Sequence, residues 1–205
     1  FGKAPKFPSP SILNFLIARS LQEKKNGNEG LSKKALHMAE FTLKAMARGG
    51  IYDQIGGGFH RYSTDGKWHI PHFEKMLYDN AQLISAYLEA FRITKNGYFA
   101  KIAADSADYI LRDMTHPDGG FYSAEDADSI PCENSQSSPD EEKEKIEGAF
   151  YVWSRKELDE ILGNDDAEIF SSHFGVKREG NAENDPHGYF EGKNILYVKQ
   201  TLDET

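Results

Sequence analysis

Apolar side chains recur three or four residues apart through the first half of the chain, and this spacing predicts helices. Ser9 followed by Pro10 predicts the start of a first helix, which Asn26 and Gly27 stop. Three more helices are predicted over residues 32–48, 73–94 and 98–114. Short turns join these helices in pairs, so the pattern predicts helical hairpins.

The second half of the chain is less regular. Ser154 to Glu157 has the form of a capping box and predicts a short helix, and a further helix is predicted over residues 166–174. Residues 195–198 are apolar and predict a short strand. Residues 131–147 are rich in Ser, Pro, Glu and Lys, which predicts a flexible surface insert.

A long connection rich in glycine, histidine and aromatic residues separates the second and third predicted helices, over residues 49–72. Plain helix–helix connections run to about 2–8 residues, and longer ones are usually functional or disordered. This connection is too aromatic for a disordered segment. It is therefore interpreted as a built surface on which polar and aromatic groups converge on a ligand.

Part of this connection is repeated. Gly49-Gly50-Ile51-Tyr52 recurs about 70 residues later as Gly119-Gly120-Phe121-Tyr122, and Gly188-Tyr189-Phe190 is a weaker echo. Repeats that bury one face only against their neighbours form solenoids or closed rings. The sequence therefore predicts an all-α fold of about three helical hairpins with long Gly/aromatic loops and minor β structure.

Composition and charge narrow the class of partner. The 205-residue chain has a net charge of −9, which argues against nucleic acid or an anionic membrane as its main partner. No apolar run approaches the roughly 20 residues of a membrane span. The chain lacks an initiating Met, so we expect a piece of a longer protein. Its single cysteine is compatible with a reducing compartment; the location stays open, with an intracellular one favoured.

Carboxylates beside aromatic rings in the predicted loops are typical of a sugar site. Aromatic faces stack on sugar C–H groups, and carboxylates bind hydroxyls or transfer protons. The catalytic candidates are His60, His72, Glu125, Asp126 and Asp128. The candidates for substrate binding are Tyr62, Trp68, Glu74, Tyr78, Asp79, Tyr122, Tyr151 and Trp153.

Other roles remain open for these residues. A single loop carboxylate often forms a turn or a helix cap, and Asp79 has first-turn stabilisation as its alternative. His69, His72 and Glu74 resemble metal ligands, but the spacing is not HExxH, no cysteine supports it and Pro71 breaks the helix that would align them. Histidine as an acid/base or buried hydrogen-bonding group is preferred, so neither a metal nor another cofactor is expected.

Four long motifs in the chain resemble one protein family. They are Lys67-Trp68-His69-Ile70-Pro71-His72-Phe73-Glu74-Lys75-Met76-Leu77-Tyr78-Asp79, Gly119-Gly120-Phe121-Tyr122-Ser123-Ala124-Glu125-Asp126-Ala127-Asp128-Ser129, Glu147-Gly148-Ala149-Phe150-Tyr151-Val152-Trp153 and Gly192-Lys193-Asn194-Ile195-Leu196. The chain is similar through these motifs to the family of spermatogenesis-associated protein 20 and its bacterial relatives.

The resemblance implies more than the residues themselves show. It implies a helical domain similar to six-hairpin (α/α)6 toroids, which glycosidases and N-acylglucosamine 2-epimerases share. Residues 1–205 would form the first half of this toroid, and the remaining half would complete it. It also implies a thioredoxin-like domain N-terminal to this chain, and the family name implies a role in spermatogenesis or fertility.

Two classes of function follow. The first is a carbohydrate-active domain that binds a small sugar-like ligand, with histidine as the base of an epimerase or isomerase or with two carboxylates as in a glycosidase. The alternative is a non-catalytic ligand- or client-binding scaffold attached to the thioredoxin-like redox domain. A structural role, in which the loop motifs only close the ring, is the weakest of the three hypotheses.

Overall fold

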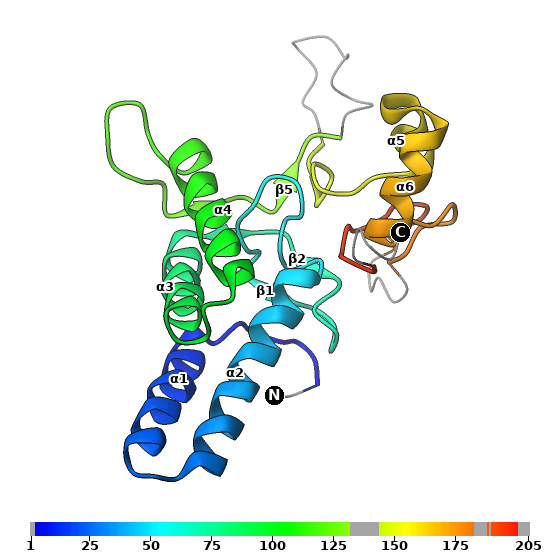
Figure 1. The fold of residues 1–205 in the computed structure, drawn as a ribbon. Coiled ribbons are helices and arrows are strands. Elements are labelled where there is room, and N and C mark those ends of the chain that lie inside the picture. Colours follow the sequence, from blue (N-terminus) through cyan, green and yellow to red (C-terminus); the bar gives the residue numbers. More distant parts are fainter. Residues whose placement is uncertain (1–2, 132–143, 183–187, 189, 201–205) are drawn as a thin grey trace.

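The computed structural model describes residues 3–131, 144–182, 188 and 190–200 (Figure 1). Among them lie six helices: α1 (Pro10–Lys25), α2 (Glu29–Arg48), α3 (Leu77–Thr94), α4 (Gly97–Asp113), α5 (Arg155–Leu162) and α6 (Asn164–Phe174). Six short strands accompany them: β1 (Tyr62–Ser63), β2 (Pro71–His72), β3 (Lys75–Met76), β4 (Ala124–Glu125), β5 (Asp128–Ser129) and β6 (Ile146–Glu147). The predicted helical class with minor β structure is confirmed.

Two helical hairpins carry the main core. Helix α1 packs along α2, α3 packs along α4, and α3 also contacts both helices of the first hairpin (Figure 1). Leu43, Met46, Leu83, Tyr87 and Phe99 are fully buried where the hairpins meet. Helices α5 and α6 contact each other and form a separate pair beside the hairpins (Figure 1).

Two helix starts differ from the prediction. Helix α2 begins at Glu29 rather than at residue 32, and α3 begins at Leu77 rather than at residue 73. The later start of α3 has a clear cause, because Lys75–Met76 pairs with Ala124–Glu125 as a two-stranded ribbon. The capping box of α5 is confirmed, since Ser154 and Glu157 each bond the other's backbone.

The strand predicted over residues 195–198 is wrong. The backbone of this segment bonds three different elements instead of a neighbouring strand. Ile195 N–H donates to the Asn181 side chain, Tyr197 N–H to the carbonyl of Phe174, and Val198 N–H to the carbonyl of Arg48. The apolar run is thus a tether between the loops and the ends of α6 and α2.

The two Gly-Gly-aromatic repeats follow equivalent helices but differ in their surroundings. Ile51 and Tyr52 are buried, whereas Phe121 is 57% exposed. A side chain at Gly49 would lie 2.3 Å from the carbonyl oxygen of Trp68, so this first copy is packed under the loop that follows. The repetition in sequence is therefore not a repetition of environment.

Three antiparallel ribbons organise the loops around the hairpins. Strand β1 pairs with β2, β3 with β4 and β5 with β6. Strand β6 lies within the predicted flexible insert, of which residues 132–143 are outside the described part of the chain. No helix in the described part of the chain is long and apolar enough to cross a membrane.

Candidate functional site

A cavity of about 930 Å³ lies where three loop regions meet. Its walls come from residues 52–60, the β3–β4 ribbon and residues 149–153, with α4 and residues 195–196 contributing as well. Four side chains predicted from the sequence line it: His60, Glu125, Tyr151 and Trp153. We take this cavity as the candidate site.

Glu125 is held at the cavity wall by two tyrosines. The hydroxyls of Tyr109 and Tyr151 each donate a hydrogen bond of 2.5 Å to one of its carboxylate oxygens. Burial, followed by the hydrogen bond to Glu125, raises the pKa of both tyrosines, so both stay protonated as donors. Both carboxylate oxygens of Glu125 therefore already accept a hydrogen bond.

Lys75 is the neighbour of Glu125 across the ribbon and is only 1% exposed. The β3–β4 register pairs Lys75 with Glu125, which places both side chains on one face of the ribbon. Its ammonium donates to Asp53 Oδ2 at 2.8 Å and to the carbonyl of Gly57 at 3.0 Å. The same ammonium lies 4.2 Å from the centre of the Tyr109 ring and is therefore fully enclosed by partners.

Asp53 balances this buried cation. Its other oxygen, Oδ1, accepts the backbone N–H groups of Ile55 and Gly56, which fixes the glycine-rich turn. Burial raises the pKa of Asp53, but the charge of Lys75 and the hydrogen bonds outweigh burial and hold the pKa below its ordinary value. Asp53 is therefore ionised at neutral pH.

His60 is buried beside this pair. Its Nδ1 lies 2.9 Å from the carbonyl oxygen of Phe73, so we assign the proton to Nδ1 and leave Nε2 unprotonated. Burial and the nearby charge of Lys75 lower the pKa of His60 to about 3. The ring meets Tyr151 edge-on with 4.8 Å between ring centres. The cavity therefore holds a neutral imidazole at neutral pH.

The other predicted histidine, His72, does not line this cavity. Backbone alternation explains the separation, because Phe73 and Lys75 line the cavity, whereas His72 and Glu74 alternate with them along the chain and do not line it. His72 and Glu74 form a second group with Arg61, Tyr62 and Glu147, which we name the His72 cluster.

Short polar contacts hold the His72 cluster together. His72 Nδ1 donates to Glu147 at 2.6 Å, and Arg61 donates to Glu74 at 2.7 Å. The Tyr62 ring stacks on His72 with 5.0 Å between ring centres. Each charged group faces a partner of opposite sign or a hydrogen-bond partner, so this cluster is a cross-link between loops.

The remaining predicted residues lie apart from the cavity. Trp68 is buried, with the ammonium of Lys6 over its ring at 4.4 Å. Asp79 is also buried, and its burial raises its pKa to about 6. Four others lie at the surface: Tyr78, Tyr122, Asp126 and Asp128.

The described residues contain no cluster of three or more His, Cys, Asp or Glu side chains arranged to bind a metal ion. The ring of His69 meets that of Tyr197, with 4.7 Å between their centres. The spaced histidines are thus distributed between different neighbours.

Comparisons with known proteins agree with the motifs. No protein-family model matches the chain. Mouse spermatogenesis-associated protein 20 is 43% identical over 216 aligned positions, which cover 100% of this chain and 26% of that protein. The human protein is 41% identical with the same coverage. The chain is a relative of spermatogenesis-associated protein 20. It spans about a quarter of the length of these curated relatives, 26%.

Likeness to solved structures is more distant. Cellobiose 2-epimerase from Bacillus thermoamylovorans has a TM-score of 0.48 at 15% identity, over 84% of this chain and 46% of the epimerase. A D-mannose isomerase has a TM-score of 0.45 at 19% identity, over 58% of this chain and 30% of the isomerase. These likenesses are too distant to assign a ring or a site to this relative of spermatogenesis-associated protein 20.

Three residues at the heart of the cavity were not predicted. Asp53 and Lys75 lie within motifs that the sequence analysis singled out, but a charged residue in a polar loop gives no sign that it is buried. Tyr109 lies in α4, on the buried face with Ile102 and Ser106. Its place within the apolar stripe was the available signal, because it combines a ring with a polar hydroxyl.

Proposed function

We propose that this cavity binds a small sugar-like ligand and that the domain is carbohydrate-active. The supporting observation is that His60, Glu125, Tyr151 and Trp153 come from three separate loops and line one cavity. Its aromatic side chains offer faces for sugar C–H groups, and its carboxylates offer acceptors for sugar hydroxyls. A neutral polyhydroxy ligand suits a site whose buried charges are already balanced.

Proton transfer of the epimerase or isomerase kind suits the cavity better than hydrolysis. A glycosidase needs one carboxylic acid held protonated opposite a second carboxylate. Asp53 has a lowered pKa, and Glu125 accepts hydrogen bonds from two hydroxyls, so neither is prepared as that acid. His60 presents an unprotonated nitrogen and is our candidate for the proton acceptor.

The low pKa of His60 sets a condition on this role. An imidazole with a pKa of about 3 is a weak base. Removal of a proton next to a sugar carbonyl creates negative charge on the substrate. That charge would stabilise the imidazolium formed at the same moment, so the base strength of His60 would rise only during the reaction.

The second candidate function is a non-catalytic scaffold that binds a ligand or client. The observation that favours it is the complete pairing of the buried charges, since Lys75 is bonded to Asp53 and Glu125 to two tyrosines. Under this reading the thioredoxin-like domain, expected in the part of the protein beyond this chain, would carry the chemistry. The relatives' name leads us to propose spermatogenesis as the setting.

Proton NMR of the full-length protein in heavy water tests these proposals. We would incubate it with aldoses, N-acyl sugars and disaccharides, alongside the variants His60→Gln and Glu125→Gln. Matched controls are His116→Gln and Glu160→Gln, whose side chains are 45% and 64% exposed. Melting curves would show that each variant is folded.

Deuterium entering at C2, lost in His60→Gln and retained in both controls, is the expected result. New reducing ends would favour hydrolysis and contradict the role given to His60. Ligand-induced shifts that Glu125→Gln abolishes, with no conversion of any sugar, would favour the scaffold. Neither conversion nor binding across the panel would overturn the sugar-site proposal.

A further inference from the structure

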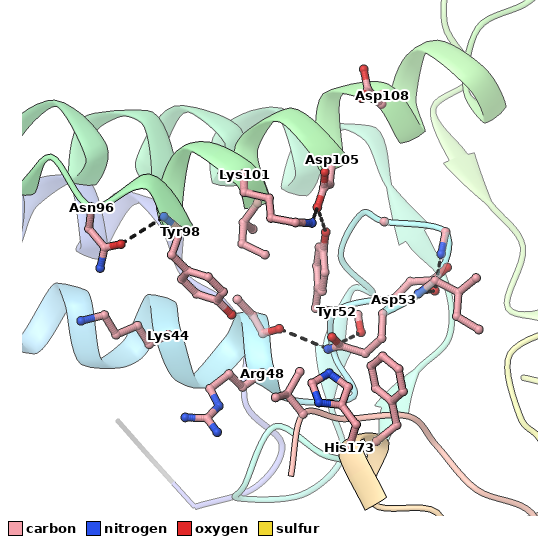
Figure 2. Close-up of a pocket in the computed structure, with 18 of the residues that line it drawn as sticks. Lys44, Arg48, Tyr52, Asp53, Asn96, Tyr98, Lys101, Asp105, Asp108 and His173 are labelled. Carbon is pink, nitrogen blue, oxygen red and sulfur yellow. Dashed lines mark hydrogen bonds and ion pairs between the residues drawn. The ribbon is translucent and has the colours of Figure 1, made fainter. Parts of the chain in front are cut away.

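A second cavity, of about 810 Å³, lies on the other side of the glycine-rich turn. It opens between α2, the start of α4 and the end of α6 (Figure 2). The turn of residues 52–56 lines both cavities. Arg112 also lines both, but the other walls differ, so the second cavity has its own chemistry.

Charged side chains of both signs line this cavity. The cations are Lys44, Arg48, Lys101 and Arg112, and the carboxylates are Asp53, Asp105 and Asp108. Lys101 pairs with Asp105 at 2.5 Å, and the guanidinium of Arg112 donates to the carbonyl of Gly56 at 2.7 Å. These two cations are thus engaged inside the protein.

The other two cations are less engaged. Within the described ranges, no carboxylate oxygen lies within 4.0 Å of the Arg48 guanidinium. The Lys44 ammonium lies 3.7 Å from Glu40 and 5.5 Å from the centre of the Phe99 ring. Lys44 and Arg48 are four residues apart on α2, so their side chains leave the same face of the helix. Figure 2 shows both side chains at the α2 wall of the cavity.

Neutral donors line this cavity at the start of α4. The side-chain oxygen of Asn96 accepts the backbone N–H of Tyr98, which leaves the NH₂ group of Asn96 as a donor. The Tyr98 ring reaches from α4 toward α2 (Figure 2). Burial raises the pKa of Tyr98 despite the opposing charge of Arg48, so the hydroxyl keeps its proton at neutral pH.

One wall of the cavity is apolar and aromatic and suits an uncharged body. The rings of Tyr52 and Phe174 and the side chains of Ile102 and Val198 line it. A volume of about 810 Å³ lies within the range of about 300–1,000 Å³ that small-molecule sites occupy. The cavity therefore combines the two lightly paired cations of α2 and neutral donors with an apolar and aromatic wall, beside carboxylates that Lys101 and Lys75 pair in part.

We propose that this second cavity binds a small phosphorylated molecule, with its phosphate between Lys44 and Arg48 and its body against the aromatic wall. Arginine and lysine beside neutral donors match the charge and the acceptor oxygens of a phosphate monoester. A polynucleotide is disfavoured because it needs an extended basic surface, which two cations in one hollow do not supply. The proposal is independent of the sugar site.

Calorimetric titration of the full-length protein tests this assignment. The probes are inorganic phosphate, a hexose 6-phosphate and a nucleoside monophosphate, each compared with its unphosphorylated parent where one exists. We expect at least one phosphorylated probe to bind at least tenfold more tightly than its parent. Comparison of the hexose 6-phosphate with the nucleoside monophosphate shows whether the aromatic wall accepts a sugar or a nucleoside.

Charge variants then locate the binding. Arg48→Gln and Lys44→Gln should each weaken the bound probe at least tenfold, whereas Lys34→Gln, an exposed position of α2 outside the cavity, should not. If Arg48→Gln fails to fold, Lys44→Gln and the charge-preserving Arg48→Lys test the proposal instead. Arg48→Lys should bind the phosphorylated probe measurably but more weakly than the parent protein does. Absence of binding by all probes, equal binding of the parents, or an equal loss in Lys34→Gln would overturn the proposal.

Discussion

At the scale of single residues, the buried ammonium of Lys75 decides how the candidate site is built. A charge this deeply enclosed is tolerated only when it is paired and hydrogen-bonded. Asp53 supplies the pair, Gly57 a carbonyl, and the ring of Tyr109 a cation–π face. The same tyrosine orients Glu125, so the lysine, its partner and the cavity carboxylate are energetically connected.

We predict strong coupling between Lys75 and Asp53. Lys75→Met leaves a mostly buried carboxylate without its cation and should lower the free energy of unfolding by about 3–5 kcal/mol. Asp53→Asn in the same chain keeps an acceptor for the turn and removes the unpaired charge, so the double variant should recover part of this loss. Denaturant unfolding of the four proteins in the cycle measures the coupling, and strictly additive losses would contradict it.

The raised pKa of Asp79 predicts that its contribution to stability falls as pH rises, which is the opposite of what an ion-paired carboxylate does. Burial, with a smaller contribution from Glu74, raises its pKa from 3.8 to about 6 in the folded protein. The folded state therefore binds this proton more tightly than the unfolded state, so its stabilisation is full below pH 3.8 and is lost as pH rises through about 6.

Asp79→Asn should remove this penalty. At pH 7.5 the variant should be more stable than the parent by up to about 3 kcal/mol, because each pKa unit corresponds to about 1.4 kcal/mol. Near pH 4 the difference should largely vanish. Melting temperatures of both proteins between pH 4 and pH 8 measure this, and a difference that does not change with pH would show that ionisation of Asp79 is not its cause.

At the scale of elements, most of the secondary structure could be predicted from helix periodicity. The hairpin helices were predicted because their buried faces repeat at helical spacing, and α5 because Ser154 and Glu157 cap it through local bonds. The ribbons depend on partners far away in the chain, as Lys75 and Glu125 show, and no local pattern encodes that pairing. For the same reason His60 and His72, equally plausible in sequence, lie in different surroundings.

The packing of the glycine-rich turn against α4 gives a prediction at this scale. Gly58 has a φ of +79°, and a side chain there would lie 2.5 Å from the Tyr109 ring. Gly119 has a φ of +91°, but a side chain there would meet nothing within 4 Å. Both glycines favour left-handed backbone, and they differ in the space around them.

Gly58→Ala should therefore be more damaging than Gly119→Ala. Each substitution should cost about 1 kcal/mol through the backbone. Gly58→Ala should cost about 1–3 kcal/mol more, because it must displace the tyrosine that bonds Glu125. Thermal unfolding compares the two variants, and equal losses would mean that the turn does not depend on close contact with α4.

At the scale of the whole molecule, the hairpins leave several large apolar side chains exposed outside their own core. Phe15 on α1, Phe41 on α2 and Leu111 on α4 are each about two-thirds exposed, at 64%, 65% and 65%. In the half-toroid that the family resemblance implies, neighbouring hairpins would cover such faces. That ring remains a proposal, since the chain spans 26% of its curated relatives.

Exposure of these side chains predicts that the 205-residue chain self-associates when it is produced alone. Sedimentation velocity should show an average mass that rises with concentration, and Phe15→Ser with Phe41→Ser should reduce this rise because both remove apolar surface without touching the core. Lys33→Ser on α2 is the matched surface control. A monomer at every concentration, with a cooperative melt at high temperature, would show that the hairpins are self-sufficient and would remove this argument for a larger ring.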